Sequence, residues 1–81
     1  MRFEGKTAIS TGAASGMGLL FSEMFAREGG NVLMCDVNEG VLWEKAEAIN
    51  AEGNGRAVPM VTDVRDYAQV TAARDRCVEE F

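Results

Sequence analysis

The hydrophobic residues of the chain fall into two kinds of spacing, short continuous runs and longer stripes with a period of three to four residues. Continuous runs at 6–11, 31–36 and 57–62 predict three β-strands. The first two are apolar enough to be buried on both faces of a sheet. Pro59 lies inside the third and cannot donate a backbone hydrogen bond, which places that strand at a sheet edge.

The stripes between and after these runs predict three helices. The first spans residues 16–28, and the stripe expected to pack on the sheet consists of Met17, Leu20, Phe21, Met24 and Phe25. Gly29-Gly30 ends it as a C-cap. Asn38 is a suitable N-cap for a second helix that runs to about Ala51, and Asp66 for a third that runs to Phe81.

Three β-α units of this length predict right-handed crossovers and a parallel sheet in the order 3-2-1. This is the first β-α-β-α-β-α half of a Rossmann-type, doubly wound α/β fold. In the complete fold the first strand is central, whereas here it lies at an edge without a further strand beside it. We therefore expect residues 1–81 to be the amino-terminal part of a single dinucleotide-binding domain, incomplete at its C-terminus.

Composition narrows the classes of protein further. The net charge of −5 argues against a nucleic-acid partner, and no run of about 18 apolar residues suggests a membrane span. Met1-Arg2-Phe3-Glu4 leads directly into the first strand, which we interpret as leaving no room for a secretory signal. Cys35 and Cys77 have no metal-site spacing, and both are expected to be buried thiols of a cytoplasmic protein. We predict no metal site.

The glycines at 12, 16 and 18 separate the first strand from the first helix, which is where a nucleotide-phosphate loop occurs. Gly12 allows a sharp turn, Gly16 a close approach of the backbone to a pyrophosphate, and Gly18 close packing of helix and strand. The N–H groups of the turn would face the anion at the positive end of the helix dipole. The alternative is that these glycines serve only the turn.

Asp36 closes the second strand 18 residues after Gly18, near the offset of about 20 expected for a ribose-binding carboxylate. The alternative is an ordinary polar strand terminus. Ser15 and Val37 flank the site and are not basic, so neither provides a cation for a 2′-phosphate. The predicted cofactor is NAD rather than NADP.

Thr-Gly-x-x-x-Gly-x-Gly at 11–18 resembles the cofactor loop of the short-chain dehydrogenase/reductase family. Gly5-Lys6, Glu28-Gly29, Asp36 and Asp63-Val64 extend the resemblance in register over the chain, and Ser10 departs from the family's usual aliphatic residue. The resemblance implies that the cofactor contacts Gly12, Ser15, Gly16, Met17, Gly18, Asp36, Asp63 and Val64. In it, Asp63 binds the adenine amino group and Val64 lines the adenine pocket; Asp63 could instead cap the last helix, in competition with Asp66.

The family transfers hydride between a nicotinamide and an alcohol or ketone, using a serine, a tyrosine and a lysine. No residue matches these three, and Tyr67 is followed four residues later by Thr71 rather than Lys, so we assign no catalytic residue. The resemblance thus implies the NAD(H)-binding part of a short-chain oxidoreductase, which we expect to be a homo-oligomer. The alternative is a free-standing nucleotide-binding or assembly module without catalysis.

Overall fold

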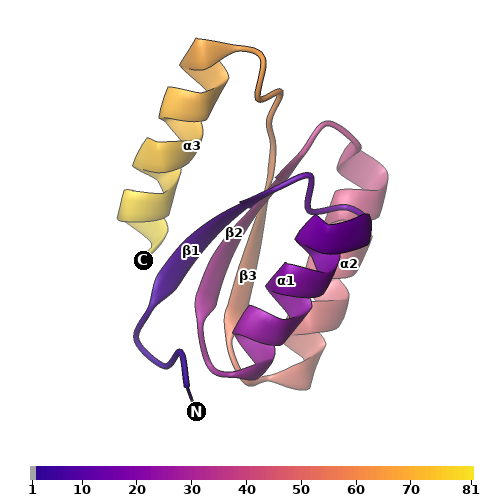
Figure 1. Ribbon diagram of the computed structural model, residues 1–81, viewed down its shortest axis with the longest axis vertical. Coiled ribbons are helices and arrows are strands. Elements are labelled where there is room, and N and C mark those ends of the chain that lie inside the picture. The colour runs from indigo at the N-terminus through magenta and orange to yellow at the C-terminus, as the bar shows by residue number, and fades with distance from the viewer. Residues whose placement is uncertain (1) are drawn as a thin grey trace.

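The computed structural model describes residues 2–81, and its elements alternate as the hydrophobic spacing predicts (Figure 1). They are β1 (Thr7–Thr11), α1 (Gly16–Arg27), β2 (Asn31–Asp36), α2 (Glu39–Glu52), β3 (Arg56–Val61) and α3 (Tyr67–Glu80). The observed ends differ from the expected ones by a residue or so. Among the residues described, no helix combines the length and apolar character that a membrane crossing requires.

The three strands form one parallel sheet in the order β1-β2-β3, which confirms the predicted topology. Val32 of β2 lies between Ala8 of β1 and Ala57 of β3. Four residues of β2 are buried, as expected for an interior strand. The expectation that β1 is buried on both faces is wrong for this structure, because β1 has a neighbour on one side only and Ile9 is 42% exposed.

Helices α1 and α2 cover one face of the sheet and α3 covers the other (Figure 1). Alternate residues of β2 separate the two layers: Val32 and Met34 pack with α1 and α2, whereas Leu33 and Cys35 pack toward α3. At the β3 edge, the Asn50 side chain of α2 donates to the Ala57 carbonyl oxygen at 2.8 Å. It also accepts from the Ala57 N–H at 2.7 Å, so α2 is fastened to the outer strand.

The face of α1 that packs on the sheet differs from the predicted stripe. Of the five predicted residues only Phe25 is buried; the other four are 46% to 81% exposed. The sheet is instead contacted through Ser22 and Ala26, with half-buried Leu19 beside them. The reason is the close approach at Gly18, where an added Cβ would lie 2.6 Å from the Thr11 carbonyl oxygen. Gly18, Ser22 and Ala26 recur every four residues on one side of the helix, and large side chains would not fit there.

Candidate cofactor site

The predicted site residues gather at the end of the sheet where the three parallel strands have their carboxyl ends. Backbone hydrogen bonds hold these ends together: the Ala13 N–H donates to the Cys35 carbonyl oxygen at 3.0 Å, and the Thr62 N–H to that of Asp36 at 2.9 Å. The glycine-rich turn, Asp36 and the segment after β3 are therefore neighbours. This edge, outside the carboxyl ends of the strands, is where open α/β sheets bind ligands.

The turn between β1 and α1 has the backbone that its glycines were predicted to provide. Gly12 and Gly16 have φ values of 62° and 59°, in the left-handed region that favours glycine. Ser15 occupies the N-cap position of α1 in an extended conformation, yet its hydroxyl makes no capping hydrogen bond. The first-turn N–H groups, which have no partner within the helix, are therefore left without that cap at the positive end of the helix dipole.

Ser10, the residue that departs from the family pattern, finds the local partner that a buried hydroxyl needs. It is 5% exposed, and its Oγ donates to the Gly18 carbonyl oxygen at 3.0 Å. The Ser22 hydroxyl donates to the same oxygen at 2.8 Å. The Ser10 bond therefore joins β1 to the first turn of α1, whereas the Ser22 bond lies within the helix.

Asp36 joins the glycine-rich turn to the end of β2. Its Oδ2 accepts the Ala14 N–H at 3.1 Å, and its Oδ1 accepts the Asn38 N–H at 2.9 Å. The hydrogen bond from the Asn38 N–H, and to a smaller extent that from the Ala14 N–H, holds the pKa of the Asp36 carboxyl below its ordinary value. Because each carboxylate oxygen can accept two hydrogen bonds, each retains capacity for a further donor such as a hydroxyl.

Asp63 lies in the segment between β3 and α3, and its carboxylate is paired with Arg65. Oδ1 accepts the Arg65 backbone N–H at 2.9 Å and its Nε–H at 3.0 Å, while Oδ2 accepts from the terminal guanidinium nitrogen at 2.9 Å. The Arg65 guanidinium lowers the pKa of Asp63 to about 2. Asp66, not Asp63, caps α3, since it accepts the Ala68 N–H at 3.0 Å. The alternative role of Asp63, as the N-cap of the last helix, is thereby excluded.

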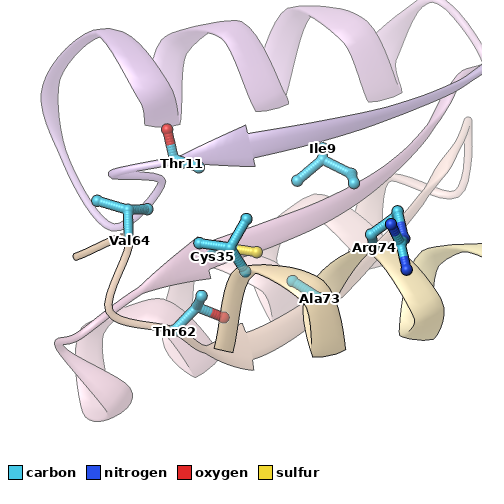
Figure 2. A pocket seen from close by; sticks show the side chains of 8 residues that line it. Ile9, Thr11, Cys35, Thr62, Val64, Ala73 and Arg74 are labelled. Carbon is cyan, nitrogen blue, oxygen red and sulfur yellow. The ribbon is translucent and has the colours of Figure 1, made fainter. Parts of the chain in front are cut away.

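A groove runs between β1 and α3, on the sheet face opposite α1 and α2. It consists of two neighbouring cavities of about 390 and 430 Å³ that share Ile9 as a lining residue. Figure 2 shows the first cavity, with Thr11, Val64 and Thr62 at the end nearest the glycine-rich turn. We call the two cavities together the β1–α3 groove. Val64, 56% exposed, lines the end of this groove that is nearest the strand ends. The resemblance implies that Val64 also lines the adenine pocket.

The structure adds contacts that the sequence reasoning missed. It did not single out Ala14, whose N–H binds Asp36, or Arg65, whose spacing two residues after Asp63 is the signal of a local side-chain turn.

Tyr67 is 83% exposed at the start of α3. Ser15 and Met17 are both exposed at the start of α1, beside Gly16. The two cysteines are buried, as expected.

The parallel sheet, the glycine-rich turn and the carboxylate after β2 define an α/β protein of Rossmann type. The sequence pattern described as short chain dehydrogenase matches residues 6–81. The chain therefore belongs to the short-chain dehydrogenase/reductase family.

The chain is similar to several known proteins over all or nearly all of its length. A sorbitol dehydrogenase of Cereibacter sphaeroides is 42% identical over 81 residues, which cover 100% of this chain and 28% of that protein. A Burkholderia phymatum short-chain dehydrogenase/reductase, solved in complex with NAD, is 38% identical with a TM-score of 0.91, over 98% of this chain and 28% of the other. An L-sorbose reductase from Gluconobacter frateurii, complexed with NADPH and L-sorbose, is 29% identical with a TM-score of 0.91. The match covers 98% of this chain and 30% of that protein. The chain thus spans somewhat more than a quarter of these proteins.

Proposed function

We propose that this chain is the NAD-binding part of a short-chain oxidoreductase that transfers hydride between a nicotinamide cofactor and an alcohol or carbonyl substrate. The observation that carries the proposal is the Asp36 carboxylate at the end of β2, joined to the glycine-rich turn through Ala14. A dinucleotide laid across this edge would place its pyrophosphate at the first turn of α1 and its adenosine ribose at Asp36. When bound, NAD supplies the hydride acceptor.

The residues present fit such a group. Without a Ser15 cap, the first-turn N–H groups of α1 can face a pyrophosphate. The Asp36 carboxyl, whose pKa lies below its ordinary value, is a hydrogen-bond acceptor for the ribose hydroxyls. The Burkholderia relative with NAD supports the same cofactor, and the sorbitol dehydrogenase supports an alcohol substrate.

The preference for NAD over NADP follows from charge. A 2′-phosphate at the ribose site would face the Asp36 carboxylate as a like charge, which costs several kcal/mol when the groups are juxtaposed. Val37 next to it is 63% exposed and uncharged. Arg65, the cation in the segment after β3, is already paired with Asp63. The proposal is therefore NAD, even though the L-sorbose reductase relative was solved with NADPH.

The test is a calorimetric titration of the complete protein with NAD and NADP. NAD should bind at least tenfold tighter, a gap of about 1.4 kcal/mol, and Asp36→Ala should shrink that ratio. Because Asp36 also holds Ala14, both affinities should fall in the variant, so the ratio is the quantity to measure. Asp75→Ala removes an equally negative but remote side chain, paired with Arg74, and should leave the ratio unchanged.

Equal affinities for NAD and NADP in the unmutated protein would contradict the assignment of Asp36. Tight NAD binding without any alcohol-dependent formation of NADH would instead favour a nucleotide-binding module without catalysis.

A further inference from the structure

Three of the four lone-pair positions of the Asp63 carboxylate are already used within the segment after β3. Oδ1 accepts two N–H groups of Arg65, and Oδ2 accepts one. A carboxylate offers about four such positions. One position on Oδ2 therefore remains, and its direction is set by the planar guanidinium on the other side of the carboxylate.

The backbone of Asp63 is held as firmly as its side chain. Its N–H donates to the Gln69 Oε1 at 2.8 Å, and the Gln69 amide nitrogen donates in turn to Asp66 Oδ2 at 3.2 Å. The Asp66 N–H donates to the Asp63 carbonyl oxygen at 3.0 Å. The segment thus presents a preorganised acceptor at the strand edge, next to Val64 and the β1–α3 groove.

We propose that Arg65 is a positioning residue for recognition of the adenine base, because it orients the Asp63 carboxylate so that one lone pair of Oδ2 is left for the exocyclic amino group. This inference rests on the proposed function and adds a residue to it. Arg65 itself contacts Asp63 and not the cofactor, and its side chain is 87% exposed. It acts on the choice of base, whereas Asp36 acts on the choice between ribose and ribose phosphate.

Lysine could not take the same role. A guanidinium provides several N–H groups in one plane, whereas an ammonium is a single point charge on a flexible stem. Arg65 uses two side-chain nitrogens on two different carboxylate oxygens. Arg65→Lys would keep a cation beside Asp63, and the N–H of residue 65 would still bind Oδ1, but the two guanidinium contacts that fix the plane of the carboxylate would be lost.

The experiment uses the complete protein and two dinucleotides, NAD and its deamino analogue, in which a carbonyl oxygen replaces the adenine amino group. The carboxylate accepts from the amino group but repels the carbonyl oxygen. NAD should therefore bind about tenfold tighter than deamino-NAD, as expected for one hydrogen bond to a charged group. Asp63→Asn should abolish or reverse this preference, because an amide can donate to the carbonyl oxygen.

Arg65→Ala should reduce the preference for NAD over deamino-NAD by at least about threefold, with Arg65→Lys between it and the unmutated protein. The ratio of NAD to NADP affinity should stay unchanged in both variants, which also shows that the site is intact. Arg27→Ala is the matched control, since it breaks another exposed arginine–carboxylate pair, with Glu52, at the opposite edge of the sheet. It should change neither ratio.

The possible outcomes separate this inference from the proposed function. No binding of NAD to the unmutated protein would overturn both. NAD binding without any preference over deamino-NAD would overturn the role of Asp63 and Arg65 but leave the cofactor assignment standing. A preference lost in Asp63→Asn yet unchanged in Arg65→Ala would overturn the role of Arg65 alone. A change confined to NADP affinity would assign Arg65 to the phosphate and equally overturn the proposal.

Discussion

The two faces of the sheet are closed in different ways. On one face, α1 and α2 bury a continuous apolar layer in which Val32, Met34 and Leu42 are fully excluded from solvent. On the other face, α3 alone packs against Leu33, Cys35 and Val58, and the β1–α3 groove stays open beside it. Figure 1 shows the same asymmetry, with α1 and α2 on one side of the sheet and α3 on the other.

The helix on the open face is also held by a different kind of interaction. Few large apolar residues of α3 reach the sheet; its buried residues are Ala73 and Cys77. Its end is tied to β3 by Arg56, which pairs with Glu80 at 2.8 Å and lies 5.4 Å from the Phe81 ring. Salt screens exposed ion pairs and acid protonates their carboxylates, whereas apolar burial has no charge to screen or protonate. The closed face and the open face should therefore respond differently to the same perturbations.

The largest expected effect concerns the open edge of the sheet. β1 exposes a row of unpaired backbone groups, and such an edge invites pairing with another chain. A chain of 81 residues also buries only about 60% of its unfolded surface. We expect the isolated segment to be marginally folded or associated, as measured by sedimentation and thermal melting. A compact monomer that melts cooperatively above about 60 °C would show that the closed face alone sustains the fold.

The second prediction compares a residue from each face in the complete protein. Leu42→Ala on the closed face should lower the free energy of unfolding by about 2–5 kcal/mol, because it leaves a cavity in a packed layer. Val70→Ala removes a side chain that lines the β1–α3 groove and is 40% exposed here. If further chain fills the groove, this smaller truncation should cost about 1–2 kcal/mol. Urea unfolding measures both.

The control for this pair is Glu44→Ala, an exposed substitution on α2 next to the buried layer, which should stay within about 0.5 kcal/mol. A Val70→Ala change as small as the control would mean that the groove remains open in the complete protein. It would then contradict the interpretation of β1 as an interior strand of a larger sheet.

The closed face also shows how much the sequence alone could predict. Strand order, the two helix caps and the meeting of Asp36 with the glycine-rich turn follow from short-range signals: apolar runs, glycines with positive φ, and polar residues at element ends. Asn38 accepts the Val41 N–H at 3.3 Å, as an N-cap should. The caps depend on neighbours in the chain, whereas the strand order and the contact of Asp36 with Ala14, 22 residues away, follow from the topology of parallel β-α-β units.

The orientation of α1 and the state of Asp63 could not be predicted in the same way. Gly18 correctly predicted close packing of helix and strand, but the large residues of α1 suggested the wrong packing face, because that close contact selects the small residues Ser22 and Ala26. Hydrophobic spacing carries no information on how near two backbones come. Likewise, the spacing of Arg65 two residues after Asp63 signals a local turn, but it does not specify that the guanidinium folds back onto both carboxylate oxygens.

The smallest expected effect is the response of α3 to acid. Arg76 and Arg56 hold the pKa of Glu80 below its ordinary 4.5. The folded state therefore binds fewer protons at this carboxyl than the unfolded state does. The stabilisation is fully present above pH 4.5 and is lost as the pH falls through the lowered pKa. Amide hydrogen exchange at the end of α3 should accelerate, relative to α2, when the complete protein is moved from pH 6 to below pH 4. Added salt should act in the same direction by screening the pairs. Glu80→Gln should exchange faster already at neutral pH and should lose the dependence on pH and salt. Equal acceleration in α2 and α3 would show instead that acid acts on the whole fold, and that the two faces are not held differently.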